Sequence, residues 1–363
     1  MASNSPGRRR DRHVYLRSHP LLFALLSASR RMPVRRLGRT VLVNGSDAYR
    51  QALTEVALDR TASGTTGGSA RRLTGGDLLF DQEDAAHRRA RRDISHVFDS
   101  AGVARTRPLW GDVLRRRVAP LAAGESVDLV DIAAELAGVA TVSLLGLNAD
   151  PRQVAAAARA AAAAAVREEL PGWRTPGQRR AARADVDRLT GVLRGATVSP
   201  ALAGMIAVAA VNTTVASIPR SVAWCADDRL WSHAADPGAL PRLVSELLRV
   251  TAPSPVLPRA VAAPGEIGGC PVRAGDRLIL VARHAAYAHE MGPDPVAPVA
   301  PRISQLVFGA GTHSCPGAGF ARAQLADTLA ALAPYRPVVV AARADRRAAL
   351  PSWATLRVRT VSR

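Results

Sequence analysis

A glycine-rich stretch near the C-terminal end of the chain, FGAGTHSCPGAG at residues 308–319, places one cysteine directly before a helical pattern. Cys315 would lie at the N-terminus of that helix, where free N–H groups and the helix dipole stabilise a thiolate, a soft metal ligand. Glycines at 309, 311, 317 and 319 let the backbone turn tightly and approach a flat ligand. A lone cysteine at a helix start is otherwise a small buried hydrophobic residue. The glycines and Phe308 favour the metal ligand.

Three further patterns hold side chains that could do chemistry, and each has a structural alternative. Glu246 and Arg249 share a helix face in SELLR, either as a functional buried pair or as an exposed pair of little value. His87 and Arg91 lie one turn apart and could reach the same anion, or they could belong to a solvated helix face rich in arginine. Thr213, inside the apolar segment 201–218, could simply bond the carbonyl four residues earlier.

Taken together, these residues resemble the cytochrome P450 superfamily. FGAGTHSCPG at 308–317 is similar to its haem-binding loop, and SELLR at 245–249 is similar to its Glu-x-x-Arg helix. AAVNTT at 209–214 resembles the oxygen-activating kink of its long central helix, and HRRAR at 87–91 resembles the segment that holds the haem propionates. The motifs come in the family's order, and the similarity runs from about residue 35 to 360.

The resemblance implies haem b, with Cys315 as the axial ligand of the iron. The residues that it implies around the haem are Phe308, Gly311 and Gly317 in the loop, and His87, Arg91, Arg259 and His313 at the propionates. It also implies that Thr213 acts in catalysis, where the central helix opens locally. The acid that usually precedes it is replaced by Asn212, whose amide cannot titrate and so cannot relay protons as an acid does. Ala210 replaces the usual glycine, and Arg302 is a candidate third partner for the Glu-x-x-Arg pair.

Composition narrows the class of protein. The chain has 363 residues and a net charge of +19, and all 49 of its basic residues are arginine. The basic runs are scattered, which does not favour a nucleic-acid partner, whereas a basic docking face for an acidic protein remains open. Three widely separated cysteines form no disulfide framework and fit a reducing, cytoplasmic location. The apolar segment 201–218 is long enough to span a bilayer, but its central Asn and Thr residues predict a helix buried in protein.

The pattern along the chain predicts a mostly α protein with a small β part, an α+β fold. Residues 1–12 look like a basic mobile arm, and residues 13–363 look like a single domain. A glycine turn within 35–44 predicts a hairpin, and the Gly/Ser/Thr-rich stretch 62–76 predicts a long loop. Helical periodicity then dominates until β-like runs with glycine turns at about 256–281. In the P450 fold, the haem lies between the central helix and the helix after the cysteine loop.

The resemblance implies a haem-thiolate monooxygenase that uses O2 and takes electrons from a ferredoxin and its reductase. A brief connection before the central helix predicts a reduced roof, which suits a small or carrier-bound natural-product intermediate as the substrate. No membrane partner is expected. Two alternatives stay open. One is a P450-type oxidase that couples rings or desaturates, which Asn212 favours, and the other is a non-catalytic haem-fold partner protein.

Overall fold

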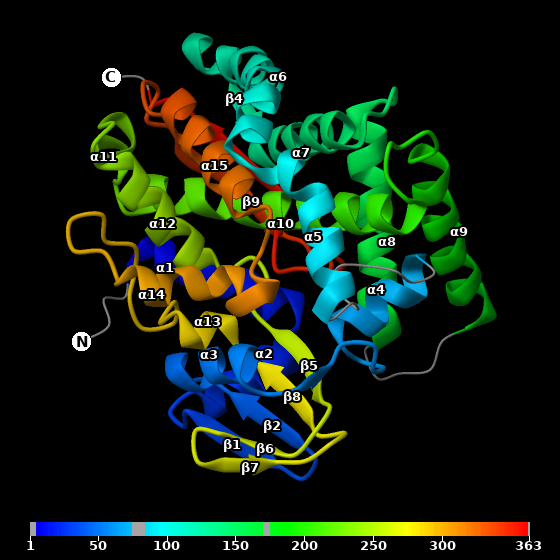
Figure 1. The fold of residues 1–363 in the computed structure, drawn as a ribbon. Helices are drawn as coiled ribbons and strands as arrows, with labels where there is room; N and C mark the ends of the chain where they lie inside the picture. The colour runs from blue at the N-terminus through cyan, green and yellow to red at the C-terminus, as the bar shows by residue number, and fades with distance from the viewer. Residues whose placement is uncertain (1–4, 75–83, 170–174, 362–363) are drawn as a thin grey trace.

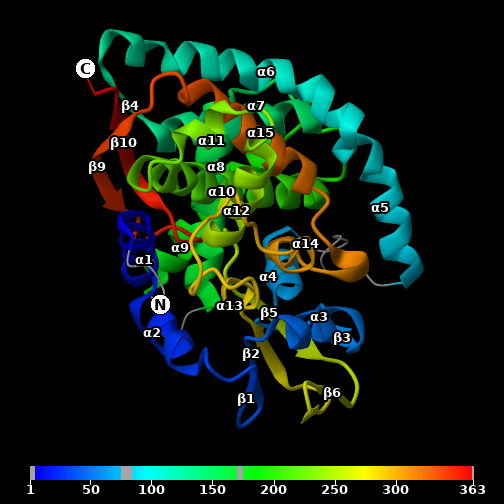
Figure 2. The same ribbon diagram turned by 90° about the vertical axis from the view of Figure 1, so that its left-hand side faces the viewer.

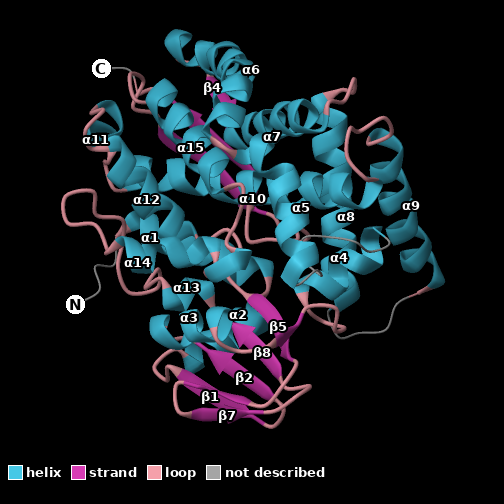
Figure 3. Cartoon of the chain, viewed as in Figure 1, coloured by secondary structure: helices cyan, strands magenta, loops and turns pink. Residues whose placement is uncertain are grey.

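The structure, a computed structural model, describes residues 5–74, 84–169 and 175–361. Helices make up most of the molecule, and a small sheet lies at one end (Figures 1 and 3). The helices are α1 (Pro6–Ser18), α2 (Pro20–Ser29), α3 (Ser46–Thr54), α4 (Thr66–Thr74), α5 (Asp84–Phe98), α6 (Ser100–Val118), α7 (Leu129–Leu145), α8 (Pro151–Glu169), α9 (Pro176–Val192), α10 (Pro200–Asp227), α11 (Trp231–Ala235), α12 (Leu240–Thr251), α13 (Ala282–Ala285), α14 (Pro301–Ser304) and α15 (Ala318–Leu332). The α+β prediction is confirmed.

The strands found in the described residues form three small sheets. They are β1 (Val34–Leu37), β2 (Thr40–Val43), β3 (Leu58–Asp59), β4 (Ser126–Asp128), β5 (Leu257–Val261), β6 (Gly265–Ile267), β7 (Cys270–Val272), β8 (Arg277–Leu280), β9 (Val338–Ala344) and β10 (Trp353–Arg359). The largest sheet has the order β1-β2-β8-β5-β3. Its first two strands are the predicted hairpin, turning at Gly38 with φ 59°, where glycine is favoured. Strand β2 pairs in parallel with β8, which joins the N-terminal hairpin to the segment that carries β5.

Helix α10 is the central element of the helical part. It begins after Ser199, whose hydroxyl accepts a hydrogen bond from the backbone N–H of Leu202 at 3.3 Å. Its side chains join one core cluster with those of α7, α8, α12 and α15 (Figure 2). Among the described residues α10 is the one helix long and apolar enough to cross a bilayer, but 61% of its apolar window is buried inside the protein. The helix is therefore a core helix, as the sequence indicates.

The expected basic arm is instead helical over the residues that the structure describes there. Helix α1 covers residues 6–18 and packs against α10. The buried carboxylate of Asp11 accepts hydrogen bonds from Arg220 of α10 at 2.6 and 2.8 Å, and Arg10 pairs with Asp227 at 2.6 Å. Residues 1–4 lie outside the described residues. An arginine-rich sequence is typical of a solvated arm. The residues that pair with α1 come more than 200 residues later, so the local sequence does not indicate that the segment is helical and packed.

The predicted loop at 62–76 is also partly helical, because α4 occupies residues 66–74. Thr65 caps the helix, since its hydroxyl accepts a hydrogen bond from the N–H of Gly68 at 3.0 Å. Helix α4 lies against α8 and α10, and this packing compensates for the low helix propensity of its two glycines. Residues 75–76 lie outside the described residues.

Candidate active site

The cysteine loop is closed by its own backbone. The N–H of Cys315 donates to the carbonyl oxygen of Phe308 at 2.8 Å. Gly309 and Gly311 have φ values of 80° and 69°, a region that side chains disfavour. A Cβ on Gly311 would also lie 3.1 Å from the methyl group of Thr54. Glycine is therefore required here by conformation and by space, and the turn delivers Cys315 to the residues just before α15, as predicted.

The environment of the Cys315 thiol differs from the expectation in one respect. Burial raises its pKa, while the N–H of Gly317 and the cations Arg91 and Arg322 act in the opposite direction. Cys315 nevertheless has appreciable accessible surface. A raised pKa and an accessible surface occur together in a side chain that solvent can reach but that protein surrounds on most sides. Burial has the larger effect on the pKa of Cys315. The protein by itself thus favours the neutral thiol, and a metal cation bound to the sulfur would favour the thiolate.

The four residues predicted to hold the propionates fall into one cluster. The rings of His87 and His313 stack with centroids 3.8 Å apart. Arg91 donates to the carbonyl oxygen of Ser314 at 2.7 Å, which ties α5 to the cysteine loop. Arg259, on β5, donates to Thr66 at the start of α4 at 2.9 Å. Residues from α5, β5 and the loop before α15 therefore meet beside Cys315.

The electrostatics of this cluster favour an anionic ligand. Burial, together with Arg60, lowers the pKa of His313 to about 3 and that of Arg259 to about 10. Burial and Arg91 lower the pKa of His87. The buried Nε of Arg259 has no hydrogen-bond partner among the described residues. Haem fits this donor set, because its two propionates supply carboxylate acceptors for crowded N–H donors and the cysteine supplies a thiolate for its iron.

Two residues of this region carried no signal in the sequence. Arg60 is almost fully buried and acts on both His313 and Arg259. Thr66, in the stretch predicted as a loop, holds the guanidinium of Arg259. Arg60 and Arg259 also line an open pocket of about 650 Å³ between β5 and the segment before α4. Only the tertiary fold brings residues 58–66 beside residue 313.

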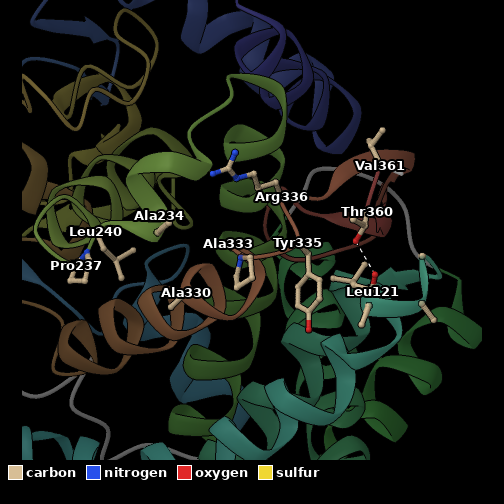
Figure 4. A pocket seen from close by; sticks show the side chains of 15 residues that line it. Leu121, Ala234, Pro237, Leu240, Ala330, Ala333, Tyr335, Arg336, Thr360 and Val361 are labelled. Carbon is tan, nitrogen blue, oxygen red and sulfur yellow. Dashed lines mark hydrogen bonds between the residues drawn. The ribbon is translucent and has the colours of Figure 1, made fainter. Parts of the chain in front are cut away.

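A second pocket, of about 1000 Å³, lies elsewhere and contains none of the predicted site residues (Figure 4). It is formed by the C-terminal end of α15, the segment between α11 and α12, and the end of the chain, with Tyr335 and Arg336 at its wall (Figure 4). The chemistry-bearing side chains gather around Cys315, so we place the active site there and not in this larger pocket.

The central helix does not open at the predicted position. Helix α10 is continuous across Asn212 and Thr213. Thr213 donates to the carbonyl oxygen of Ala209 at 2.8 Å, which is the structural alternative considered from the sequence. The Nδ2 of Asn212 donates to the carbonyl oxygens of Val208 at 2.8 Å and Ala158 at 3.3 Å. The asparagine therefore links α10 to α8.

Helix α10 is also linked to the helix that follows the cysteine. Thr214, next to Thr213, donates to the side-chain oxygen of Gln324 on α15 at 3.3 Å. Both residues are buried. Helices α10 and α15 thus contact one another at this point of the described structure.

The Glu-x-x-Arg pair is fully buried, as the resemblance implies. Arg249 donates to Glu246 at 2.6 and 2.9 Å, and both side chains have no exposed surface. Arg249 also donates to the carbonyl oxygen of Gly292 at 2.7 Å. Arg302, the candidate third arginine, is exposed instead. The carboxylate of Glu246 accepts from backbone N–H groups of residues 294 and 299, each at 3.2 Å, so the irregular segment before the cysteine loop fills that role.

The fold, the Cys315 thiol and the cluster of cationic and N–H donors together suit a protein that binds haem. No family model matches the chain. It is 30% identical over 287 residues to erythromycin C-12 hydroxylase of Saccharopolyspora erythraea, and this alignment covers 68% of this chain and 69% of that protein. Over 106 residues it is 34% identical to 20-oxo-5-O-mycaminosyltylactone 23-monooxygenase of Streptomyces fradiae, covering 29% of this chain and 25% of that one.

Solved structures agree on the fold. A 6-coordinated cytochrome P450 from Thermus thermophilus superposes with a TM-score of 0.78 at 18% identity, covering 94% of this chain and 98% of that one. P450BioI in complex with an acyl carrier protein superposes with a TM-score of 0.76 at 17% identity, covering 95% and 99%. The chain belongs to the cytochrome P450 family. Haem is therefore its cofactor, and its activity is that of a monooxygenase.

Proposed function

We propose that this enzyme hydroxylates a small or carrier-bound natural-product intermediate, with O2 as the oxygen source. The observation that carries the proposal is the Cys315 loop with the cluster of arginine and histidine side chains beside it. The two named relatives act on erythromycin and on a tylactone derivative by their names, which supports a natural product as the substrate class. The connection between the Ala-rich helix α8 and α10 is longer than the sequence indicated, because helix α9 lies within it, and only the last part, residues 193–199 between α9 and α10, is short.

Several residues beside Cys315 would share the binding of the cofactor. Cys315 would ligate the iron, and the N–H of Gly317 would stabilise its sulfur. Arg91 and Arg259 would bind the propionates as cations, while His87 and His313, with lowered pKa values, would donate hydrogen bonds as neutral rings. Haem held by a thiolate supplies the activation of O2 and the oxidation of a C–H bond.

Thr213 and Asn212 are proposed to act on the oxygen side. The hydroxyl of Thr213 can give up its hydrogen bond to the carbonyl oxygen of Ala209 and donate to a ligand instead, because one hydrogen bond replaces another of similar strength. Asn212 cannot deliver a proton, and both N–H bonds of its amide already go to backbone carbonyl oxygens. Protons would therefore reach the site through water or substrate groups.

The position of Asn212 favours a second candidate function. With no acid at this position, oxygen insertion lacks its usual proton donor on α10, which leaves open an oxidase that couples rings or desaturates its substrate and takes up the same two protons with each O2 and two electrons. The mass of the product separates the two reactions: hydroxylation adds one oxygen atom, whereas coupling or desaturation removes two hydrogen atoms. A product that gains no oxygen in ¹⁸O2 would overturn hydroxylation.

The electron donor is proposed to be an acidic ferredoxin, supplied by its reductase in the cytoplasm. Arg88, Arg89 and Arg92 are exposed on α5, on the helix whose Arg91 contacts the cysteine loop. Arg322 of α15 is half-buried, with its guanidinium 4.6 Å from the centre of the Phe308 ring. Reduction by a ferredoxin should slow steeply as the salt concentration rises, and a flat response would contradict electrostatic docking.

The primary test of the site is spectroscopic. Purified protein, loaded with haem, reduced and treated with carbon monoxide, should show the strongly red-shifted Soret band of thiolate ligation. Cys315→Ser should abolish that band while the protein stays folded by circular dichroism. Cys270→Ser is the matched control, because Cys270 lies on β7, outside the site. A Cys315→Ser protein with the wild-type spectrum would refute the assignment.

A further inference from the structure

One corner of the molecule carries large apolar side chains that no part of the described structure covers. Helix α2 has Leu21 and Leu25 exposed by 81% and 70%. They lie four residues apart and so share one helix face. Phe23 and Leu26 point the other way, into a core cluster with Tyr15. Helix α2 is thus fixed to the protein by one face and presents leucines on the other.

Further apolar side chains are exposed on the elements that precede and follow α2 along the chain. We call this group the α2 patch. Its members are Leu16 on α1, Leu21, Leu22 and Leu25 on α2, Met32 after α2, and Leu37 on β1. Helices α1 and α2 contact one another, and both lie with β1 at the outer edge of the molecule (Figure 2). Single exposed leucines are ordinary, whereas a group of this kind marks an interaction surface.

The chain segment that carries most of the α2 patch has charges of one sign, although Asp276 from a distant segment pairs with its Arg36. From Arg12 to Ser46 the sequence has seven arginines and no aspartate or glutamate. Several of these arginines are exposed and make no ion pair with any described residue, among them Arg17, Arg30, Arg31 and Arg35. Leucines that protrude by more than two thirds of their surface are therefore framed by guanidinium groups without a carboxylate partner.

We propose that the α2 patch is a peripheral docking site for an anionic lipid bilayer. Apolar side chains on one face of a surface helix enter the boundary between headgroups and acyl chains, and flanking arginines bind the lipid phosphates. The leucines of α2 form a protruding surface and not a groove, which suits a fluid partner that adapts to any shape. This contact differs from membrane spanning, since α10 is buried, and it departs from the expectation of no membrane partner.

The test measures binding of the full-length, haem-loaded protein to vesicles by co-sedimentation. Wild-type protein should bind vesicles of equal parts phosphatidylglycerol and phosphatidylcholine, and should bind pure phosphatidylcholine at least about tenfold more weakly. Leu21→Ser with Leu25→Ser should lower binding to the anionic vesicles at least about tenfold, since two leucines leave the bilayer. The matched control is Val338→Ser with Val340→Ser, exposed apolar residues on β9, which should bind as wild type.

A charge variant gives a second, independent measurement. Arg30→Gln with Arg31→Gln should weaken binding and flatten its dependence on salt, whereas Arg346→Gln with Arg347→Gln, an exposed pair near β9, should change neither. Equal binding of wild type and both patch variants would overturn the proposal. So would a dimer, seen by analytical ultracentrifugation, that the two leucine substitutions dissociate and that vesicles do not compete, because a second copy would then cover the patch.

Discussion

Replacing Asp11 by asparagine should destabilise the protein far more than its place near the N-terminus suggests. Its side chain is 2% exposed and accepts two hydrogen bonds from Arg220, whose side chain is 1% exposed. Arg283 is also within 3.1 Å of Asp11, and both guanidinium groups lie over the Tyr15 ring, at 4.5 and 3.8 Å from its centre. Asp11→Asn therefore leaves two cations close together with no carboxylate.

The magnitude follows from the burial of the pair. Removing one partner of a buried, hydrogen-bonded ion pair costs about 3–5 kcal/mol, because the other charge stays desolvated and unpaired. Unfolding entropy scales at about 2.1 cal/mol/K per residue, so a chain of 363 residues changes its melting temperature by about 1.3 °C for each kcal/mol. The expected decrease is about 4–7 °C.

The assay is thermal unfolding of the haem-loaded protein by circular dichroism. The matched control is Asp227→Asn, which breaks the Arg10–Asp227 pair between the same two helices, where the side chains are 31% and 11% exposed. A pair with such access to solvent contributes about 0–1 kcal/mol, so this variant should lose no more than about 1 °C. The reasoning is refuted if Asp11→Asn melts within about 1 °C of the control.

Three other outcomes follow from the described contacts. Arg249→Met leaves the Glu246 carboxylate buried without its cation, so the free energy of unfolding in urea should fall by about 3–5 kcal/mol and the protein should retain less haem. Asn212→Asp replaces a donor to two backbone carbonyl oxygens by an acceptor; stability at pH 8 should fall by about 1–3 kcal/mol, and faster turnover at unchanged stability would contradict the linking role. Burial lowers the pKa of His284 to about 3 and that of His289 to about 4, so the unfolded chain binds more protons below pH 6.5. Urea unfolding should therefore show stability falling from pH 6.5 towards pH 4, by up to about 1.4 kcal/mol per pH unit for each histidine, and His284→Asn should reduce that slope.

The cysteine loop was predictable because its constraints are local. Gly309 and Gly311 adopt backbone angles that other residues avoid, and the conformation of the turn is encoded within a dozen positions. The hairpin at 35–44 was predictable for the same reason, with Gly38 at its turn. The burial of Glu246 with Arg249 followed only from the resemblance, since their spacing alone also describes an exposed pair.

The remaining features depend on partners that are distant in sequence. Helix α1 has the sequence of an arm because its single acidic residue, Asp11, has its cation 209 residues away. Helix α4 has the sequence of a loop because its two glycines disfavour a helix by more than the Thr65 cap stabilises one. Packing against α8 and α10 supplies the remaining stability. The backbone N–H groups that replace a third arginine beside Glu246 belong to an irregular segment with no pattern of its own.

The pairing of β2 with β8 has a consequence for folding during synthesis on the ribosome. Residues 40–43 leave the ribosome long before residues 277–280, their parallel partners, are made. At about 5–20 residues per second, the first hairpin waits on the order of ten seconds or more with an unpaired edge. During that interval the nascent chain exposes both the unpaired edge of β2 and the leucines of α2. We therefore expect a chaperone to bind this early segment.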